Sequence, residues 1–279
     1  MRKFEEQFFE VLMIIASLVI FSSLILIFWT VLKRGLPAMS WDMVARVPEG
    51  GFYLGKEGGL LNAIAGSIYL VIGASLLGLF ISIPVVIFIN LYLPEKSLLA
   101  SITRLAADVL FGIPSIVYGA FAFTLMIYLG LKTSLLAGII AVTLLIIPIL
   151  IRSMDEAARF APRELKDAAM SLGATKFEFI KVLLKQIAPG LTTAVLLSIG
   201  RAIGDVASVL FTTGYTDSVP GSLLQPAATL PLAIFFQLGS SVKEVQDRAY
   251  AAALILTVIV LTLSLTARFF SRKFSKNKI

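Results

Sequence analysis

Residues 8–32 read FFEVLMIIASLVIFSSLILIFWTVL, and Glu10 is the one ionisable side chain in the stretch. About 20 apolar residues in a helix are enough to cross the hydrocarbon core of a bilayer. The stretch is longer than the apolar core of a signal peptide, and it lacks a small-residue cleavage site. It therefore predicts a membrane helix that is retained as an anchor.

Five further apolar runs of roughly 18 residues or more follow this first stretch. They cover residues 61–93, 105–129, 133–151, 188–213 and 250–270. Pro84, Pro114 and Pro148 lie inside three of these runs and predict kinks. Another apolar stretch, residues 223–238, is shorter and contains two prolines and two glutamines, which favours a re-entrant or interfacial segment. We expect an all-α, polytopic membrane protein with six transmembrane helices.

The composition agrees with a membrane location. The chain is 58% hydrophobic and 15% charged, whereas soluble domains are about 45–50% apolar and about 25% charged. Its 279 residues are enough for six spans with loops, but not for an additional soluble domain. Cysteine and histidine are both absent. This excludes disulfides, Cys/His zinc sites and catalysis by a thiolate or a histidine base, so we do not expect an enzyme.

The distribution of Lys and Arg predicts the orientation of the chain. With an internal N-terminus, the cytoplasmic segments hold sixteen of these residues and the external segments hold seven. The cytoplasmic segments are 1–7, 94–104, 152–187 and 268–279, and the external ones are 33–60, 130–132 and 214–249. Basic loops stay on the cytoplasmic side, so both termini are expected inside, in a multi-pass protein of the cytoplasmic (inner) membrane. The net charge of +7 then reflects orientation and lipid contact, with no nucleic acid as a partner.

Residues 152–187 contain several helix signals in succession. Residues 153–156, Ser-Met-Asp-Glu, match a capping box and predict that a helix starts there. Pro162 fits the first turn of a second helix, and Gly173 is suited to end it in a left-handed cap. Residues 175–178, Thr-Lys-Phe-Glu, form another capping box that starts a third helix. The expected structure is a helix, a glycine turn and a helix at the cytoplasmic face.

This loop has two interpretations that its local chemistry leaves open. It could be an amphipathic connector that rests on the bilayer, with its lysines facing lipid phosphates. Alternatively, the small pair Ala168 and Ala169, with Leu172 one turn further on, could fit closely into a groove on a partner protein.

Arg201 and Asp205 place two charges inside the run 188–213. They are four residues apart, so on a helix they share a face and can pair. At 1.5 Å per residue Arg201 would lie about 20 Å into a core of about 30 Å. Such intramembrane charges are costly and usually line a path or pocket. Gly200 and Gly204 form a G-x-x-x-G pattern that allows another helix to approach closely.

The charged pair also has two interpretations. It could be a satisfied ion pair that holds helices together. Alternatively, Arg201 could contact an anion in transit, because a guanidinium offers a planar donor fork for the oxygens of phosphate or sulfate. Asp205 would then hold Arg201 in place and temper its charge, so that the anion is passed on rather than trapped. An importer, a passive anion channel or a secondary carrier could each use this pair.

Residues 167–173, Asp-Ala-Ala-x-x-x-Gly, resemble the "EAA" loop of ABC importer permeases, with Asp167 in the place of the usual Glu. The Leu-Pro that normally follows is missing, and a proline appears later, at Pro189. In that family the loop forms a coupling helix that lies in a cleft of the ATPase subunit. The resemblance therefore implies ATPase coupling by Asp167, Ala168, Ala169, Leu172 and Gly173. A channel or a secondary carrier does not need such a loop.

Residues 201–207, Arg-Ala-Ile-Gly-Asp-Val-Ala, resemble the Arg-Ala-x-Gly-Glu region of PstA-type permeases of phosphate-specific ABC importers, with Asp205 in the Glu position. Similar resemblances occur at residues 35–41, 108–117 and 225–231, so that together they cover about 33–271. The resemblance implies the type I ABC importer permease fold and a phosphate path that includes Arg201 and Asp205. One arginine cannot distinguish phosphate from another oxyanion, so phosphate rests on the resemblance alone.

The resemblance also implies the partners and the division of the chain. The partners would be a second, PstC-type permease, two cytoplasmic PstB-type ATPase subunits, an external phosphate-binding protein and membrane lipid. ATP and Mg would bind the ATPase and this chain would hold no cofactor, because its G-x-x-x-x-G-K run at residues 50–56 is followed by Glu57 rather than Ser or Thr. The expected division is an anchor and external loop (1–60), a permease domain (61–271) and a basic cytoplasmic tail (272–279).

Overall fold

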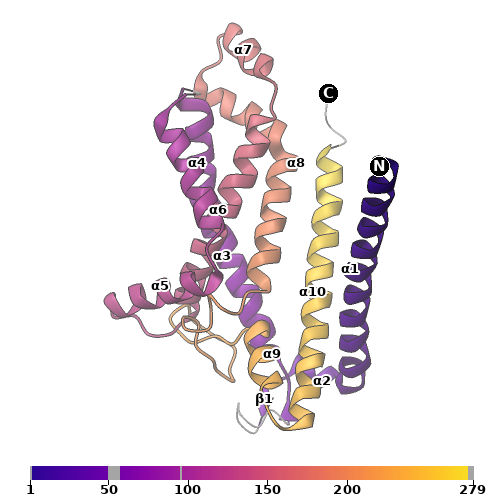
Figure 1. Ribbon diagram of the computed structural model, residues 1–279. Coiled ribbons are helices and arrows are strands. Elements are labelled where there is room, and N and C mark those ends of the chain that lie inside the picture. Colours follow the sequence, from indigo (N-terminus) through magenta and orange to yellow (C-terminus); the bar gives the residue numbers. More distant parts are fainter. Residues whose placement is uncertain (1, 50–56, 95, 276–279) are drawn as a thin grey trace.

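The computed structural model describes residues 2–49, 57–94 and 96–275. Almost all of its regular structure is helical, and the two short strands form one antiparallel hairpin (Figure 1). The elements are α1 (Arg2–Ala38), α2 (Trp41–Ala45), β1 (Pro48–Glu49), β2 (Glu57–Gly58), α3 (Leu61–Ile87), the π-helix η1 (Phe88–Tyr92), α4 (Leu98–Phe111), α5 (Ser115–Tyr128), α6 (Leu135–Arg159), α7 (Arg163–Ser171), α8 (Lys176–Ile203), α9 (Leu230–Leu238) and α10 (Lys243–Ser275). The G-x-x-x-x-G-K run and the end of the predicted tail lie outside the described residues.

Within this described part, the helices α1, α3, α6, α8 and α10 are each long and apolar enough to cross a membrane. A sixth crossing is available if α4 and α5 together count as one bent span. The all-α, polytopic membrane class is therefore confirmed, with five spans, or six if the bent pair counts as one. The helix α9 has nine residues, about 14 Å at 1.5 Å per residue. This agrees with the prediction that residues 223–238 are too short to span.

The predicted span 105–129 is wrong as a single helix. The helices α4 and α5 meet at an angle of 104°, and Figure 1 shows α5 pointing away from the other helices. The break lies at Gly112–Pro114, where Pro114 has an extended backbone with ψ of 139°. Proline has no N–H to donate and disfavours helical geometry in the residue before it. Hydropathy does not register such a break, because the residues on both sides are apolar.

The predicted span 188–213 has both ends in the wrong place. The helix α8 begins at Lys176, within the polar loop, and ends at Ile203. Gly204 is a poor helix former. The Asp205 carboxylate accepts a hydrogen bond from the Ser208 N–H at 2.8 Å. A short acidic side chain that bonds nearby backbone in this way competes with helix continuation, so turns replace the helix after Ile203.

The predicted helix start at residues 153–156 is also wrong. The helix α6 continues through these residues to Arg159 without interruption. Met154 is fully buried in the core, and Asp155 bonds to side chains of other elements rather than to its own backbone. A capping-box sequence acts as a cap only where the preceding backbone is not already helical.

The core of the bundle surrounds α6, which packs against both α3 and α8. Val142, Ile146 and Leu150 repeat every four residues along α6 and are all buried. This spacing places them on one face of a helix. A second apolar cluster, towards the β1–β2 hairpin, joins α2, the start of α3, α9 and α10. The two clusters fix the helices that position the predicted site residues.

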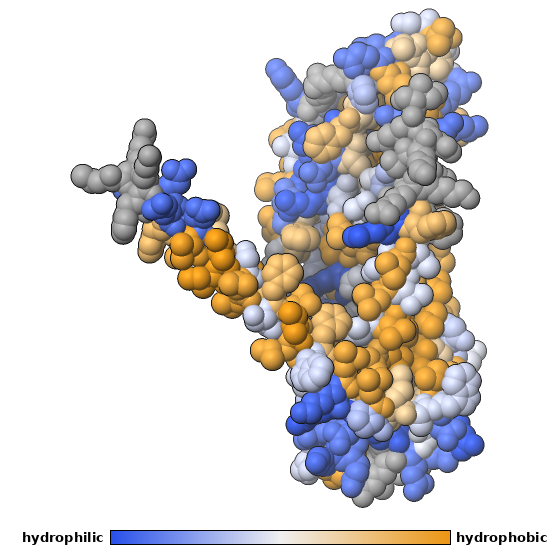
Figure 2. Space-filling view, turned by 90° about the vertical axis from the view of Figure 1, so that its right-hand side faces the viewer, coloured by the Kyte–Doolittle hydropathy of each residue, from blue (hydrophilic) through white to orange (hydrophobic). Residues whose placement is uncertain are grey.

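The N-terminal helix α1 is anchored near one end. Gly35 lies so close to α10 that a Cβ on it would be 2.7 Å from the Tyr250 carbonyl oxygen, and the Arg34 guanidinium lies 5.0 Å from the centre of the Tyr250 ring. Most of its remaining side chains are exposed. In Figure 2 α1 leaves the body as an arm with a hydrophobic surface. That surface needs cover from lipid or from another chain.

The elements are distributed unequally between the two ends of the molecule. The start of α1, the end of α10 and the helix α7 lie at one end, and α2, α9 and the hairpin lie at the other (Figure 1). This agrees with the prediction that both termini share a side with residues 152–187. The identity of that side, and the division of the chain into three parts, stay predictions.

The segment 204–229 is tied to the start of α6. The Ser134 N–H donates to the Thr212 carbonyl at 3.0 Å, and the N–H groups of the next two residues donate to Gln225 and Leu223 carbonyls at 2.8 Å each. The first N–H groups of a helix have no partner within the helix. Carbonyl groups from a distant segment therefore complete the N-terminal turn of α6.

Candidate functional site

The structure brings Arg201 and Asp205 together, as predicted, but not on one helix. Arg201 lies in the last turn of α8, and Asp205 follows the C-cap residue Gly204. The Arg201 Nη2 and Asp205 Oδ1 atoms are 3.9 Å apart, with 49% of the Arg201 side chain and 6% of the Asp205 side chain exposed. A pair this long is weak, so the exposed guanidinium keeps donors available for another acceptor.

Asp205 is held more firmly than Arg201. Its Oδ2 accepts the Ser208 N–H, and Ser67 and Thr229 line the same small space between α3 and α9. A buried carboxylate needs a hydrogen-bond donor, here the Ser208 N–H, or a paired cation. Arg201 has a further stabilising effect, because a positive charge in the last turn of a helix compensates the partial negative charge there. The carboxylate is therefore fixed, whereas the arginine can move towards an anion.

The pattern Gly200-x-x-x-Gly204 faces no helix in the described part of this chain. Among the described residues, no atom lies within 4 Å of a Cβ placed on Gly200. For Gly204 the nearest such atom is the Gly200 carbonyl oxygen, at 3.8 Å. Close helix packing at these glycines stays a prediction, and another chain would have to supply the helix.

The predicted glycine turn after α7 is confirmed. Gly173 has a φ of +84°, in the left-handed region. Its N–H donates to the Met170 carbonyl at 3.0 Å, and the Ala174 N–H donates to the Ala169 carbonyl at 3.1 Å. These two bonds form a Schellman motif. Of the predicted coupling residues, Asp167, Ala168 and Leu172 are exposed, whereas Ala169 packs against the core.

The predicted capping box at Thr175 is confirmed as well. The Glu178 N–H donates to Thr175 Oγ1 at 3.3 Å, and the Thr175 N–H donates to Glu178 Oε2 at 2.7 Å. The helix that starts here is α8 itself, and it continues as far as Ile203. The helix predicted to start at residues 175–178 and most of the predicted span 188–213 are therefore parts of one element. One continuous helix thus joins the turn after α7 to Arg201.

Comparison with known proteins places these features in a family. The model of one family, described as "Binding-protein-dependent transport system inner membrane component", matches residues 93–277. The match includes α7, Gly173, Arg201 and Asp205. The chain belongs to this family of inner-membrane transport components.

Individual relatives match a larger part of this chain than the family model does. The phosphate transport system permease protein PstA of Yersinia pestis is 36% identical over 255 residues, which are 90% of this chain and 84% of that protein. PstA of Pasteurella multocida is 32% identical over 274 residues, which are 96% and 95% of the two chains.

A solved structure supports the predicted type I ABC importer permease fold of this family member. The inward-facing MetNI methionine ABC transporter matches with a TM-score of 0.62, over 77% of this chain and 95% of that chain. The sequence identity is 19%, so the likeness concerns the fold alone.

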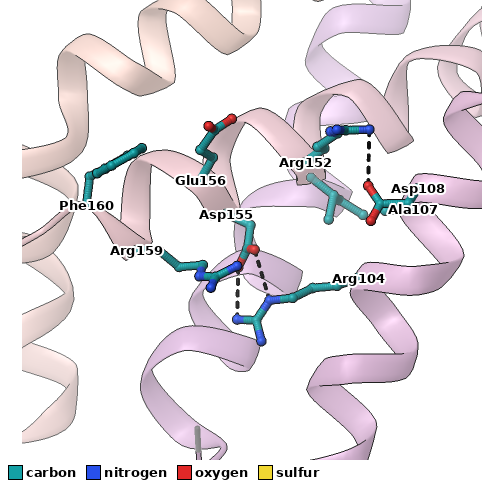
Figure 3. Close-up of a pocket in the computed structure, with 9 residues that line it drawn as sticks. Arg104, Ala107, Asp108, Arg152, Asp155, Glu156, Arg159 and Phe160 are labelled. Atoms are coloured by element: carbon teal, nitrogen blue, oxygen red, sulfur yellow. Dashed lines mark hydrogen bonds and ion pairs between the residues drawn. The ribbon is translucent and has the colours of Figure 1, made fainter.

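A polar cluster at the α7 end of the bundle is not among the sites predicted from the sequence of this transport component. Arg104 donates from Nε to Asp155 Oδ2 at 2.9 Å and from Nη2 to Asp155 Oδ1 at 3.1 Å, and Asn90 donates to Asp155 Oδ1 at 2.8 Å. Arg152 pairs with Asp108 at 3.2 Å (Figure 3). The one sequence signal that could have indicated this cluster is the set of charged residues at the ends of the apolar runs. Among the described residues, no group of three His, Cys, Asp or Glu could hold a metal ion.

Proposed function

We propose that this chain is the membrane-spanning permease subunit of an ATP-driven importer that translocates inorganic phosphate across the cytoplasmic membrane. The main support is the likeness to the PstA permeases of Yersinia pestis and Pasteurella multocida over 90% and 96% of the chain. A likeness of that extent includes the helices, the loop before α8 and the charged pair rather than one motif. Both relatives are phosphate transport system permeases, so they favour phosphate over another oxyanion and a permease subunit over a passive channel or a secondary carrier.

In this function Arg201 contacts phosphate in transit. Its guanidinium is half exposed and only weakly paired, so its planar donor fork can bind two oxygens of a tetrahedral anion. Asp205 is anchored by the Ser208 N–H and limits the net positive charge at the site. The anion is therefore released again, because transport requires a site that is not too strong.

The loop 152–187 couples transport to ATP hydrolysis. The exposed residues Asp167, Ala168 and Leu172, with the turn at Gly173, would lie in a cleft of an ATPase subunit. The helix α8 begins directly after this turn and has 28 residues, about 42 Å at 1.5 Å per residue. A tilt imposed on α7 would thus be transmitted along α8 to Arg201.

The remaining components belong to other chains. ATP and Mg bind two cytoplasmic PstB-type ATPase subunits, and an external phosphate-binding protein delivers the substrate. A second, PstC-type permease packs against the Gly200–Gly204 face, where no atom of the described part of this chain lies within 4 Å of a Cβ on Gly200. Membrane lipid covers what remains of the apolar surface.

The proposed division of the chain follows from this role. Residues 1–60 anchor the subunit and form its external loop, residues 61–271 form the permease domain, and residues 272–279 form a basic cytoplasmic tail. Both termini and α7 face the cytoplasm, since basic segments are retained on that side.

Phosphate uptake by the reconstituted importer tests this function. Proteoliposomes containing the full complex are loaded with ATP, and uptake is normalised to the amount of assembled complex. Arg201→Gln is expected to reduce uptake by about tenfold or more, because a charge-assisted bidentate contact is lost. Arg201→Lys should also reduce uptake, though by less, since the point charge of lysine lacks the planar donor fork of arginine. Asp205→Asn keeps an acceptor for the Ser208 N–H but removes the negative charge, so phosphate is held longer and turnover falls.

Arg46→Gln is the matched control, because Arg46 is an exposed arginine in an ion pair with Asp42 at the opposite end from α7. It should leave uptake per complex unchanged. Normal uptake per complex in Arg201→Gln would remove Arg201 from the path and leave the pair with a role in helix packing. Phosphate flux through this chain without ATP or ATPase subunits would instead favour a channel.

A further inference from the structure

A cavity of about 450 Å³ opens at the α7 end of the bundle, between α4 and α6. Its charged lining consists of Arg104, Asp108, Arg152, Asp155, Glu156 and Arg159 (Figure 3). Arg201 lies at the opposite end of α8 from α7. The cavity is therefore separate from the charged pair of the proposed transport path.

Two of the three carboxylates in this cavity are already neutralised. Asp155 is held by Arg104 through two bonds, and Asp108 is paired with Arg152. In Figure 3 the third carboxylate, on Glu156, points away from Asp155, whereas Arg159 extends towards Asp155 and Arg104. Across the described part of the chain, no ion pair involves Arg159. The charged lining as a whole is balanced, with three guanidinium groups and three carboxylates, but on the side of Asp155 two guanidinium groups, of Arg104 and Arg159, face one carboxylate.

Arg159 and Arg104 present their guanidinium groups to the same side of this cavity. Guanidinium groups bind oxyanions through paired N–H donors. Arg104 is fixed by its two bonds to Asp155, so part of the cost of ordering the site is already met by the fold. Arg159 is exposed and can turn to an incoming ligand. The combination of one fixed and one free guanidinium favours an anion with several oxygens.

We propose that this cavity binds a phosphate-type oxyanion, with Arg159 as the principal donor and Arg104 as a fixed second one. The ligand is either free inorganic phosphate or the headgroup of an anionic lipid, which share this chemistry. The coupling helix α7 begins at Arg163, four residues beyond Arg159. A ligand in the cavity therefore lies next to the segment that would contact the ATPase.

Arg159 has a second effect that the test must separate from binding. It lies in the last turn of α6, where a positive charge compensates the partial negative charge of the helix terminus. If Arg159 acted only in this way, its replacement would change the thermal stability of the chain. It would not change a response that depends on phosphate concentration.

A fluorophore at the cavity provides a direct measurement. The chain has no cysteine, so Phe160→Cys, at an exposed residue that lines the cavity, can be labelled alone in the full chain. The labelled chain is placed in phosphatidylcholine nanodiscs and titrated with inorganic phosphate at constant ionic strength. In a second arm, phosphatidylglycerol replaces part of the phosphatidylcholine. If free phosphate is the ligand, the fluorescence changes saturably with phosphate concentration in the first arm. If a lipid headgroup is the ligand, the fluorescence changes in the second arm.

In whichever arm responds, Arg159→Gln should lower the affinity for the ligand by about tenfold. Arg159→Lys should lower it less. Arg46→Gln, which alters an arginine at the other end of the molecule, should leave it unchanged. The unfolding midpoint is recorded for each variant, so that a loss of binding is scored only for folded protein. An equal response in Arg159→Gln and Arg46→Gln, or no response in either arm, would overturn the proposal. The measurement involves neither ATP nor transport, so its failure would leave the proposed function standing.

Discussion

Gly173 is the residue at which backbone geometry alone predicts a functional effect. Its φ is +84°, and no atom of the described residues lies within 4 Å of a Cβ placed there. Gly173→Val therefore meets no steric obstacle from neighbours, but it forces a β-branched residue into the left-handed region at a cost of about 1–2 kcal/mol or more. We expect the Schellman turn to open and α7 to lose its orientation, with membrane insertion intact. Transport-linked ATP hydrolysis by the assembled complex, measured in proteoliposomes, should fall.

Gly130 provides a matched control for this substitution. It also has a positive φ, +66°, and open space around its Cβ position, but it lies in the turn between α5 and α6. Gly130→Val imposes the same kind of strain away from α7 and its turn. If both variants hydrolysed ATP normally during transport, or if both lost activity equally, the assignment of Gly173 to coupling would be wrong.

At the residue scale, the sequence predicts features whose partners are close along the chain. The bonds of the Thr175 capping box join residues three apart, and the left-handed Gly173 follows from the same local chemistry. The pair of Arg104 with Asp155 joins residues 51 apart. No pattern in a single sequence brings these two residues together, because their meeting depends on how α4 and α6 pack.

At the element scale, two ion pairs join α4 to α6 and differ in burial. In the pair Arg104–Asp155 the side chains are 27% and 8% exposed, and in Arg152–Asp108 they are 53% and 54% exposed. Removing one partner of a buried pair leaves an uncompensated charge and costs about 3–5 kcal/mol. An exposed pair contributes about 0–1 kcal/mol. The first pair should therefore hold α4 to α6, and the second should contribute little.

Thermal unfolding of the purified chain in detergent can separate these two contributions. Arg104→Met should lower the unfolding midpoint markedly, whereas Arg152→Met should leave it nearly unchanged. The double variant Arg104→Met/Asp155→Leu should regain much of the lost stability, because no unpaired charge remains. Equal effects of Arg104→Met and Arg152→Met would contradict this account of the α4–α6 contact.

The errors of prediction at the element scale share a physical cause. Hydropathy identifies segments that belong in a membrane, and it identified the apolar runs correctly. It does not distinguish a continuous helix from two helices joined at Gly112–Pro114, nor does it place the end of α8 before Asp205. The capping-box sequence at 153–156 is misleading because it is a local signal that packing overrides. Packing of Met154 and the contacts of Asp155 favour continuation of α6 over a local cap.

At the scale of the whole molecule, the arrangement of the ends predicts which positions are reachable from outside a cell. Ser171, in α7, and Ser222, in the segment 204–229, are both exposed and lie near opposite ends of the molecule. Because the chain has no cysteine, a single cysteine at either position reports on that position alone. With intact cells and an impermeant thiol reagent, Ser222→Cys should react and Ser171→Cys should not.

Ser171→Cys should react once the cells are permeabilised, which shows that its thiol is accessible. Reaction of Ser171→Cys in intact cells would reverse the predicted orientation. In that case α7 would face away from the compartment that contains ATP, and the proposed contact with an ATPase would be impossible.

The hydrogen bonds between the start of α6 and the segment 204–229 impose an order on biosynthesis. The Leu135 N–H pairs with the Gln225 carbonyl, which the ribosome adds about 90 residues later, or roughly 5–20 s later at a common translation rate. During that interval this end of α6 has emerged without its partners, and unpaired amides are poorly tolerated in hydrocarbon. The nascent helix must then keep its first turn in water or against the insertion machinery. The N-terminal turn of α6 can thus reach its final hydrogen bonding only after the segment 204–229 has been synthesised.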